Sequence, residues 1–322
     1  MSRSIVRRAY AKINIGLDVT GKRSDGYHLI DTVMQTVGLY DTLTFSPRDD
    51  GQIHITVNDP AVPADERNLV WKAVRLLEQA ASITNSGAAA SKAGSSDTAG
   101  NMPDKSAGWE HSFGLDIDLI KRIPSQAGMG GGSSDAAETL KAVRELYELD
   151  IRDDELLALG AKLGADIPFC LTGGTVRCTG IGEVLKPLAS AIHCPVLIVK
   201  PPEGVSTPLV YRKLDDMTFS HPDMDKTEAA LRNGDPDALA RVLGNVLENA
   251  AAKEVPVICD IKKKLCEKGA FAASMSGSGT SVFGLFADRA AAAAAENDLR
   301  KHFDKNYMIL LTEIGGNDVN DI

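Results

Sequence analysis

A glycine-rich segment between a strand and a helix is the feature that most limits how this chain can fold. Residues 124–137 are P-S-Q-A-G-M-G-G-G-S-S-D-A-A, with four glycines within five positions. Residues 115–120 alternate between apolar and acidic side chains, which predicts a strand. Residues 136–149 carry apolar side chains at helical spacing. Glycine admits positive φ and close approach to the backbone, so successive N–H groups can converge on an anion at a helix N-terminus. The segment therefore predicts a phosphate-binding loop.

Two well-known phosphate-binding patterns do not fit this segment. A P-loop requires a lysine after its last glycine, and none follows here. The dinucleotide pattern G-x-G-x-x-G fails because Ser133 occupies the third glycine position, and no acidic residue closes a following strand. A simple strand–helix corner is the alternative, but four glycines followed by Ser133 and Ser134 favour phosphate binding. The serine hydroxyls would add donors or a ligand for a phosphate-bound metal.

The composition is that of a globular protein large enough for one large or two medium domains. Of 322 residues, 43% are hydrophobic and 25% charged, and the formal net charge is −9. This charge argues against nucleic acid or an anionic membrane as the main partner. No apolar run reaches about 18 residues, and the N-terminus lacks the apolar core of a signal peptide. Five cysteines without a C-x-x-C pair indicate neither a zinc site nor a disulfide framework, so we expect a reduced, cytoplasmic protein.

Local patterns predict an α+β chain that begins with strands. Strands are expected over residues 5–18, 28–40, 41–47, 52–57, 115–120, 195–200 and 308–312. Helices are expected over residues 67–80, 136–149, 153–163, 227–231, 236–247, 256–268 and 289–302. Glycine-edged hairpins are expected over residues 172–183 and 270–286, and an extended loop over residues 201–211.

Residues 85–108 differ from the rest of the chain. They are almost entirely Ala, Ser, Gly, Asp, Asn and Lys, without an apolar period. Such a segment cannot bury enough apolar surface to order itself. We therefore expect a disordered insertion that forms a mobile loop between a helix and a strand.

Four polar residues have both a structural and a functional interpretation. Lys12 lies opposite the apolar side chains of its strand, where a lysine usually faces solvent or guards an edge. Asp166, which lies between Gly-Ala and Ile-Pro, is by itself most simply a turn cap. Tyr27 and His28 follow an Asp-Gly turn, where a tyrosine can be half-buried and a histidine only hydrogen-bonded.

Several separate stretches together resemble the GHMP kinases, a family of small-molecule kinases. The glycine segment is similar to the family signature P-x-x-x-G-[LM]-G-[GS]-S-[SA]. Other stretches of this chain resemble one branch of the family: Y-A-K-I-N-I-G-L-D-V, R-S-D-G-Y-H, G-A-D-I-P-F, G-V-S-T-P-L-V-Y, L-G-N-V-L-E and M-S-G-S-G-T-S-V-F-G. The resemblance covers essentially the whole chain except residues 85–108. It implies a two-domain α+β fold with the active site in the cleft, an N-terminal nucleotide-binding domain over residues 1–190 and a C-terminal domain over residues 191–322.

The resemblance also implies the substrates and the residues that bind them. The donor would be ATP with Mg²⁺, and the acceptor a small molecule linked to cytidine diphosphate. Asp166 would be the general base and Lys12 its partner, because a carboxylate within reach can take the proton of an alcohol while an ammonium stabilises developing charge. Tyr27 and Tyr211 would enclose the cytosine ring, and His28 would recognise its polar edge. Further acceptor contacts would come from Asn14, Ile181 and Thr207.

On the nucleotide side, the resemblance implies two groups of contacts. Asn68 and Lys121 match positions near adenine. Metal ligands are not implied. The remaining implied nucleotide contacts are Pro124, Gly128, Gly130, Gly131, Gly132, Ser133, Ser134, Gly277, Ser278 and Gly279.

Two other functions remain open on the sequence alone. Another GHMP kinase, of the homoserine or mevalonate type, would need no cytosine pocket, so the pair Tyr27 and Tyr211 argues against it. A catalytically silent nucleotide-binding sensor would need no base, so the presence of Lys12 and Asp166 argues against it. We expect neither nucleic acid nor membrane as a partner, and a monomer or weak homodimer.

Overall fold

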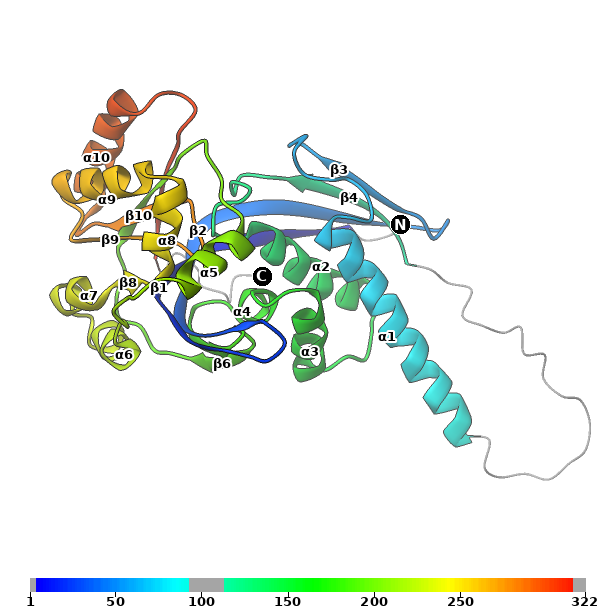
Figure 1. Cartoon of the computed structure of the whole chain (residues 1–322). Helices are drawn as coiled ribbons and strands as arrows, with labels where there is room; N and C mark the ends of the chain where they lie inside the picture. The colour runs from blue at the N-terminus through cyan, green and yellow to red at the C-terminus, as the bar shows by residue number, and fades with distance from the viewer. Residues whose placement is uncertain (1–3, 93–112, 315–322) are drawn as a thin grey trace, which may run out of the picture.

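The protein is described by a computed structural model that covers residues 4–92 and 113–314, with residues 83–92 described as backbone only (Figure 1). Its strands form two sheets. The first sheet has the order β3-β4-β2-β1-β8, and β5 and β6 extend it from β2. Its strands are β1 Ile5–Lys22, β2 His28–Arg48, β3 Ile53–Val57, β4 Gly114–Ile120, β5 Thr175–Gly180, β6 Val184–Pro187 and β8 Gly244–Asn245.

The second sheet has the order β11-β7-β10-β9. Its strands are β7 Pro195–Lys200, β9 Ala272–Met275, β10 Val282–Leu285 and β11 Met308–Glu313. The helices are α1 Leu69–Lys92, α2 Gly131–Leu146, α3 Asp153–Leu163, α4 Ile167–Thr172, α5 Thr207–Asp215, α6 Met224–Asn233, α7 Pro236–Val242, α8 Leu247–Glu254, α9 Val257–Glu267 and α10 Arg289–His302. In the described residues, no helix combines the length and apolarity needed to cross a membrane.

The middle of strand β1, residues 11–19, is buried on both faces because each face packs against a different part of the molecule. Ala11, Ile13 and Ile15 join a core with side chains of the second sheet. Lys12 and Asn14 lie on the opposite face, as the alternation predicts, but they are buried at 4% and 1% exposure. The interpretation of Lys12 as a solvated edge lysine is therefore wrong.

The strand predictions were mostly confirmed, with one merger. The expected strands at 28–40 and 41–47 form the single strand β2, because β2 pairs antiparallel with β1 along its length. A register shift after Tyr10 lets the pairing continue through the junction of the two expected strands. The hairpin expected over 270–286 is confirmed as β9 and β10.

Several predictions of loops and helices need correction. The expected insertion 85–108 is wrong at its start, since α1 continues to Lys92, and residues 93–108 lie outside the described residues. The loop expected over 201–211 ends at Thr207, where Pro208 stabilises the first turn of α5. The helix expected over 236–247 is interrupted, because residues 244–245 pair with β1 as β8. The division of the chain near residue 190 stays a prediction.

The close packing of α3 on α4 links the fold to the site, because α4 follows directly after Asp166. Gly160 of α3 is buried, and a Cβ there would lie 2.8 Å from Ile167 Cγ2 and 3.0 Å from Leu171 Cδ1. Both distances are too short for ordinary contact, so α4 can approach α3 this closely only because residue 160 is glycine.

We expect Gly160→Val to lower the free energy of unfolding by about 1–3 kcal/mol through overpacking. The substitution should also reduce turnover by displacing α4. Thermal melting and steady-state kinetics measure the two effects. Ala158→Val, at an exposed position of the same helix, is the matched control. Equal melting temperatures for the two variants would contradict the packing argument.

Candidate active site

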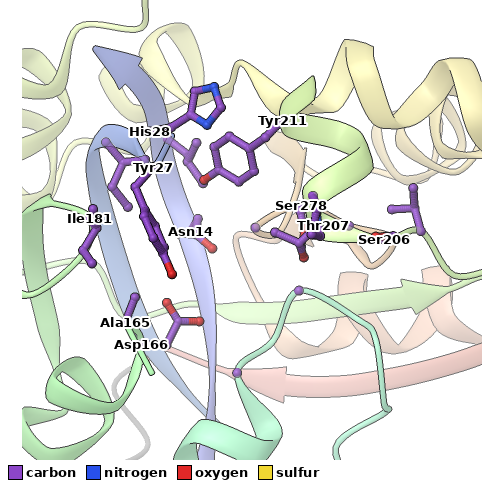
Figure 2. A pocket seen from close by; sticks show the side chains of 18 of the residues that line it. Asn14, Tyr27, His28, Ala165, Asp166, Ile181, Ser206, Thr207, Tyr211 and Ser278 are labelled. Atoms are coloured by element: carbon purple, nitrogen blue, oxygen red, sulfur yellow. The ribbon is translucent and has the colours of Figure 1, made fainter. Parts of the chain in front are cut away.

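A cleft of about 1000 Å³ lies where β1, the turn after it, the glycine segment, α5 and the loop between β9 and β10 meet (Figure 2). A smaller hollow of about 280 Å³ lies on the other side of the glycine segment. The two hollows share Gln126, Gly128, Gly130 and Ser133. A group bound to this segment can therefore be reached from both sides.

The structure brings Lys12 and Asp166 together across 154 positions of sequence. Lys12 Nζ lies 3.5 Å from Asp166 Oδ2 and donates to Asn14 Oδ1 at 2.8 Å. Asp166 occupies the N-cap position of α4, but its side chain makes no capping hydrogen bond. Its side chain is 32% exposed and lines the cleft. The turn-cap interpretation therefore does not account for this carboxylate.

The Asn14 side chain is hydrogen-bonded to Lys12 and to the neighbouring strand. Its Nδ2 donates to Thr32 Oγ1 at 2.9 Å, and the Thr32 hydroxyl donates to the Gly16 carbonyl at 2.6 Å. Since Asn14 Oδ1 accepts from Lys12, a chain of hydrogen bonds fixes the ammonium near Asp166.

The glycine segment forms the N-terminus of α2. Gly130 caps the helix with φ 69°, a left-handed conformation that favours glycine, and the helix starts at Gly131 rather than at the expected residue 136. A Cβ on Gly130 would lie 3.0 Å from Lys12 Cγ. The side chain of Lys12 therefore passes directly against the segment, with its ammonium beside the cap.

A second glycine-rich loop, residues 276–280, packs on the first one. Gly128 has φ 71°, and a Cβ there would lie 2.0 Å from the Ser276 carbonyl oxygen. The Ser276 hydroxyl donates to the Gly128 carbonyl at 2.9 Å. Asn245 fixes the second loop from behind, because its Nδ2 donates to the Met275 and Gly277 carbonyls, both at 2.8 Å.

Two aromatic side chains from different elements enter the cleft. Tyr27, from the turn between β1 and β2, is 62% exposed, whereas Tyr211 lies on α5 and is half-buried (Figure 2). The Tyr211 ring lies 4.8 Å from the His28 ring at 30°, and His28 Nε2 contacts Asp215 Oδ1 at 2.6 Å. Burial raises the pKa of Tyr211 to about 12, so its phenol stays neutral.

Most of the predicted site residues line one of the two hollows. The larger cleft is lined by Lys12, Asn14, Tyr27, His28, Asp166, Ile181, Thr207, Tyr211, Gly277, Ser278 and Gly279, and the smaller hollow by Lys121, Pro124, Gly128, Gly130, Gly131, Gly132 and Ser133. Asn68 and Ser134 are not among the lining residues. Asn68 instead caps α1 by accepting from the Val70 N–H at 2.9 Å, and the Ser134 hydroxyl donates to the Tyr10 carbonyl at 2.7 Å.

Lys121 is held in a buried cluster beneath the glycine segment. Its ammonium contacts Asp41, and it donates to Asp135 Oδ2 at 2.6 Å. Asp135 Oδ1 has no hydrogen-bond partner in the described part of the chain. Burial raises the pKa of Asp135 to about 7, and repulsion from Asp41 adds to this effect while Lys121 opposes it.

Sequence reasoning missed several residues of this site. Asp41 and Asp135 gave no signal because a carboxylate in a strand or helix is usually exposed. Asp215 lies one turn after Tyr211 on α5, and helical spacing from Tyr211 would have indicated it had α5 been predicted. Arg212 also lines the larger cleft, but its spacing from Tyr211 gives no such signal. Gln126 has φ 51°, which the sequence does not reveal.

Sequence comparisons match most of the chain to known kinases. The profile described as "GHMP kinases N terminal domain" matches residues 68–174, and that described as "GHMP kinases C terminal" matches residues 227–305. A 4-diphosphocytidyl-2-C-methyl-D-erythritol kinase from Clostridium novyi (strain NT) is 41% identical over 302 residues, which cover 94% of this chain and 98% of that protein. A kinase of the same name from Lachnospira eligens is 42% identical over 299 residues, covering 92% and 94%.

Solved kinase structures also match this fold over almost the whole chain. A crystal structure of 4-(cytidine 5'-diphospho)-2C-methyl-D-erythritol kinase has a TM-score of 0.75 and 31% identity, covering 97% of this chain and 100% of that one. A homoserine kinase from Cytophaga hutchinsonii has a TM-score of 0.68 at 20% identity, covering 98% and 96%. At that identity, the second likeness concerns the fold alone.

The raised pKa of Asp135 makes stability depend on pH in a defined direction. The folded state favours protonated Asp135. The stability that this protonation contributes is fully present below the unfolded pKa of about 3.8 and is lost as pH rises through about 7. Asp135→Asn cannot ionise. Its melting temperature should therefore rise relative to the wild type between about pH 5 and about pH 8.5.

Thermal melts at the two pH values measure this difference. The exposed Asp216→Asn is the control and should follow the wild type at both. A constant difference between Asp135→Asn and the wild type would mean that Asp135 does not titrate in this range.

Proposed function

The chain belongs to the GHMP kinase family, among the 4-diphosphocytidyl-2-C-methyl-D-erythritol kinases, and from this premise we propose how its cleft carries out the reaction. The protein is an ATP-dependent kinase that phosphorylates this cytidyl substrate, a step in non-mevalonate isoprenoid synthesis. We assign the transfer to the 2-hydroxyl, which gives the 2-phosphate and ADP.

The observation that carries the assignment of roles is the Lys12–Asp166 pair beside Gly130. The carboxylate faces the larger cleft, and the ammonium passes against the cap of α2. A Cβ on Gly277 would lie 3.3 Å from Lys12 Nζ, so this ammonium is also next to the second glycine-rich loop. An acceptor hydroxyl near Asp166 would thus meet a phosphoryl group held by the loops.

In the phosphoryl transfer that follows, one proton moves from the acceptor hydroxyl to Asp166. As the acceptor oxygen forms its bond to the γ-phosphorus, Asp166 takes the hydroxyl proton, and the bond from phosphorus to the β-phosphate oxygen breaks to release ADP. Lys12 stabilises the negative charge that is shared between the two oxygens and the phosphoryl group. Asn14 keeps Lys12 in place.

The nucleotide is assigned to the smaller hollow and the N-terminus of α2. Backbone N–H groups of the glycine segment and the positive end of the helix dipole suit a polyphosphate, which lets an acidic protein bind an anion. Within the described residues, no three His, Cys, Asp or Glu side chains are grouped to hold a metal. The Ser133 hydroxyl, which lines this hollow, would be an oxygen ligand for Mg²⁺, and the ion would neutralise part of the charge of the ATP phosphates.

The acceptor is assigned to the larger cleft, with its cytosine between Tyr27 and Tyr211. Both side chains line the cleft, and His28 is oriented by Asp215 next to Tyr211. Ile181 would add apolar contact. Thr207 would bind the acceptor, which is supported by its position in the lining of the cleft beside Ser278. We further propose a cytoplasmic monomer or weak homodimer.

We expect Asp166→Asn to lower kcat by about 10²–10⁴-fold, the usual contribution of a positioned base, while ATP affinity changes little. A coupled ADP-release assay with the cytidyl substrate, beside homoserine and mevalonate, measures turnover and acceptor choice together. Asp154→Asn, on the exposed start of α3, is the control. Near-normal turnover by Asp166→Asn would remove it from the role of base.

Tyr27→Ala tests the cytosine assignment. Stacking of a base on an aromatic side chain contributes about 1–3 kcal/mol, so KM for the cytidyl substrate should rise roughly ten- to a hundredfold with KM for ATP unchanged. Tyr27→Phe keeps the ring and should be mild. Calorimetry with CDP should show a parallel loss of affinity. An effect on ATP alone would exclude the cytosine sandwich.

A further inference from the structure

Lys200 is a buried charged residue that the proposed reaction does not use. It is the last residue of β7 and is only 6% exposed. In the described part of the chain no carboxylate lies within ion-pair distance of its ammonium, and burial lowers its pKa. Burying an ammonium without a paired carboxylate costs free energy, which hydrogen bonds to its N–H groups must offset.

Those hydrogen bonds go to the backbone of the next loop. Lys200 Nζ donates to the Pro201 carbonyl at 2.6 Å and to the Glu203 carbonyl at 3.0 Å. The Glu203 carbonyl also accepts from the Thr280 hydroxyl at 2.7 Å. Thr280 is fully buried at the end of the second glycine-rich loop. One carbonyl therefore joins a buried lysine to the loop that packs on Gly128.

The same loop touches the glycine segment on its other side. A Cβ on Gly204 would lie 2.7 Å from Gln126 Oε1, so the Gln126 side chain packs directly against the backbone of residue 204. Gln126 lines both hollows. Residues 203–204 are thus in contact with both loops that surround the proposed point of transfer.

The loop leads directly into the acceptor side of the cleft. Val205, Ser206 and Thr207 line the cleft, and α5 begins at Thr207 and carries Tyr211 one turn later (Figure 2). A shift of residues 201–206 would therefore move the acceptor contacts relative to the phosphate-binding loops.

We propose that Lys200 is a positioning residue for the acceptor: together with the Thr280 hydroxyl, its ammonium fixes the Glu203 carbonyl and so sets the start of α5 against the phosphate-binding loops. This inference rests on the proposed function of the cleft. The lysine itself need not touch either substrate.

Lys200→Met keeps the length of the side chain and removes its donors. A lysine with a purely structural role can often be replaced by an apolar residue without loss of stability or change in KM. A positioning role predicts instead that KM for the cytidyl substrate rises roughly tenfold, while KM for ATP stays within about twofold. Melting temperature is measured in parallel.

A double-mutant cycle tests whether Lys200 and Thr280 act through the same carbonyl. Thr280→Val removes the hydroxyl at nearly constant shape and should also raise acceptor KM. The double variant Lys200→Met/Thr280→Val should show less than the product of the two single effects. Lys213→Met is the control, because Lys213 lies on α5 but pairs with Glu254 away from the cleft.

Hydrogen exchange gives a readout that does not depend on turnover. Backbone amides of residues 203–206, which follow the two prolines of this loop, should exchange faster in Lys200→Met than in the wild type or Lys213→Met. Unchanged acceptor KM, equal rises in both KM values, or multiplicative effects in the cycle would each overturn the proposal. A wild type that does not phosphorylate the cytidyl substrate would overturn the proposed function, whereas faster exchange in Lys200→Met would still support the fixing of the loop.

Discussion

The close contact between the two glycine-rich loops is the constraint on which the cleft depends. A Cβ on Gly128 would overlap the Ser276 carbonyl at 2.0 Å, and the Ser276 hydroxyl donates to the Gly128 carbonyl. This contact joins a loop that precedes α2 to one between strands of the second sheet. Because it leaves no room for a side chain, any larger residue at position 128 would separate the two halves of the site.

Burial of polar groups around this contact gives the site its rigidity. Lys12, Asn14 and Thr32 form one hydrogen-bonded chain under the glycine segment, and Asp41, Lys121 and Asp135 form a second cluster beside it. Such groups are stable in the interior only when their partners are held in place. The loops that contact phosphate can therefore keep irregular backbone conformations, such as φ 51° at Gln126, on a fixed support.

Alternation and helical periodicity predicted most of the elements, and the predicted α+β GHMP kinase fold is confirmed by the family and structure matches. Helix α3, strand β7 and helix α10 have the predicted bounds, because each has an uninterrupted local pattern. The errors fall where long-range pairing overrides local preference. Residues 244–245 were expected to be helical but pair with β1. The two strands expected over 28–40 and 41–47 are one because β1 pairs with both parts.

The sequence alone located the groups that matter: a glycine segment that opens a helix, a lysine in a strand, and an aspartate at a turn. Each is a local pattern, so each is visible without a structure. For the lysine and the aspartate the local pattern favoured structural roles, and only the family resemblance implied catalytic ones. Only the tertiary structure decided that Lys12 and Asp166 lie 3.5 Å apart, that Lys121 is enclosed by two carboxylates, and that Lys200 holds a backbone carbonyl. The first two relations depend on contacts between residues far apart in the sequence, which no local pattern encodes. The third joins neighbours in the sequence, but the carbonyl that Lys200 holds is also fixed by the distant Thr280 hydroxyl.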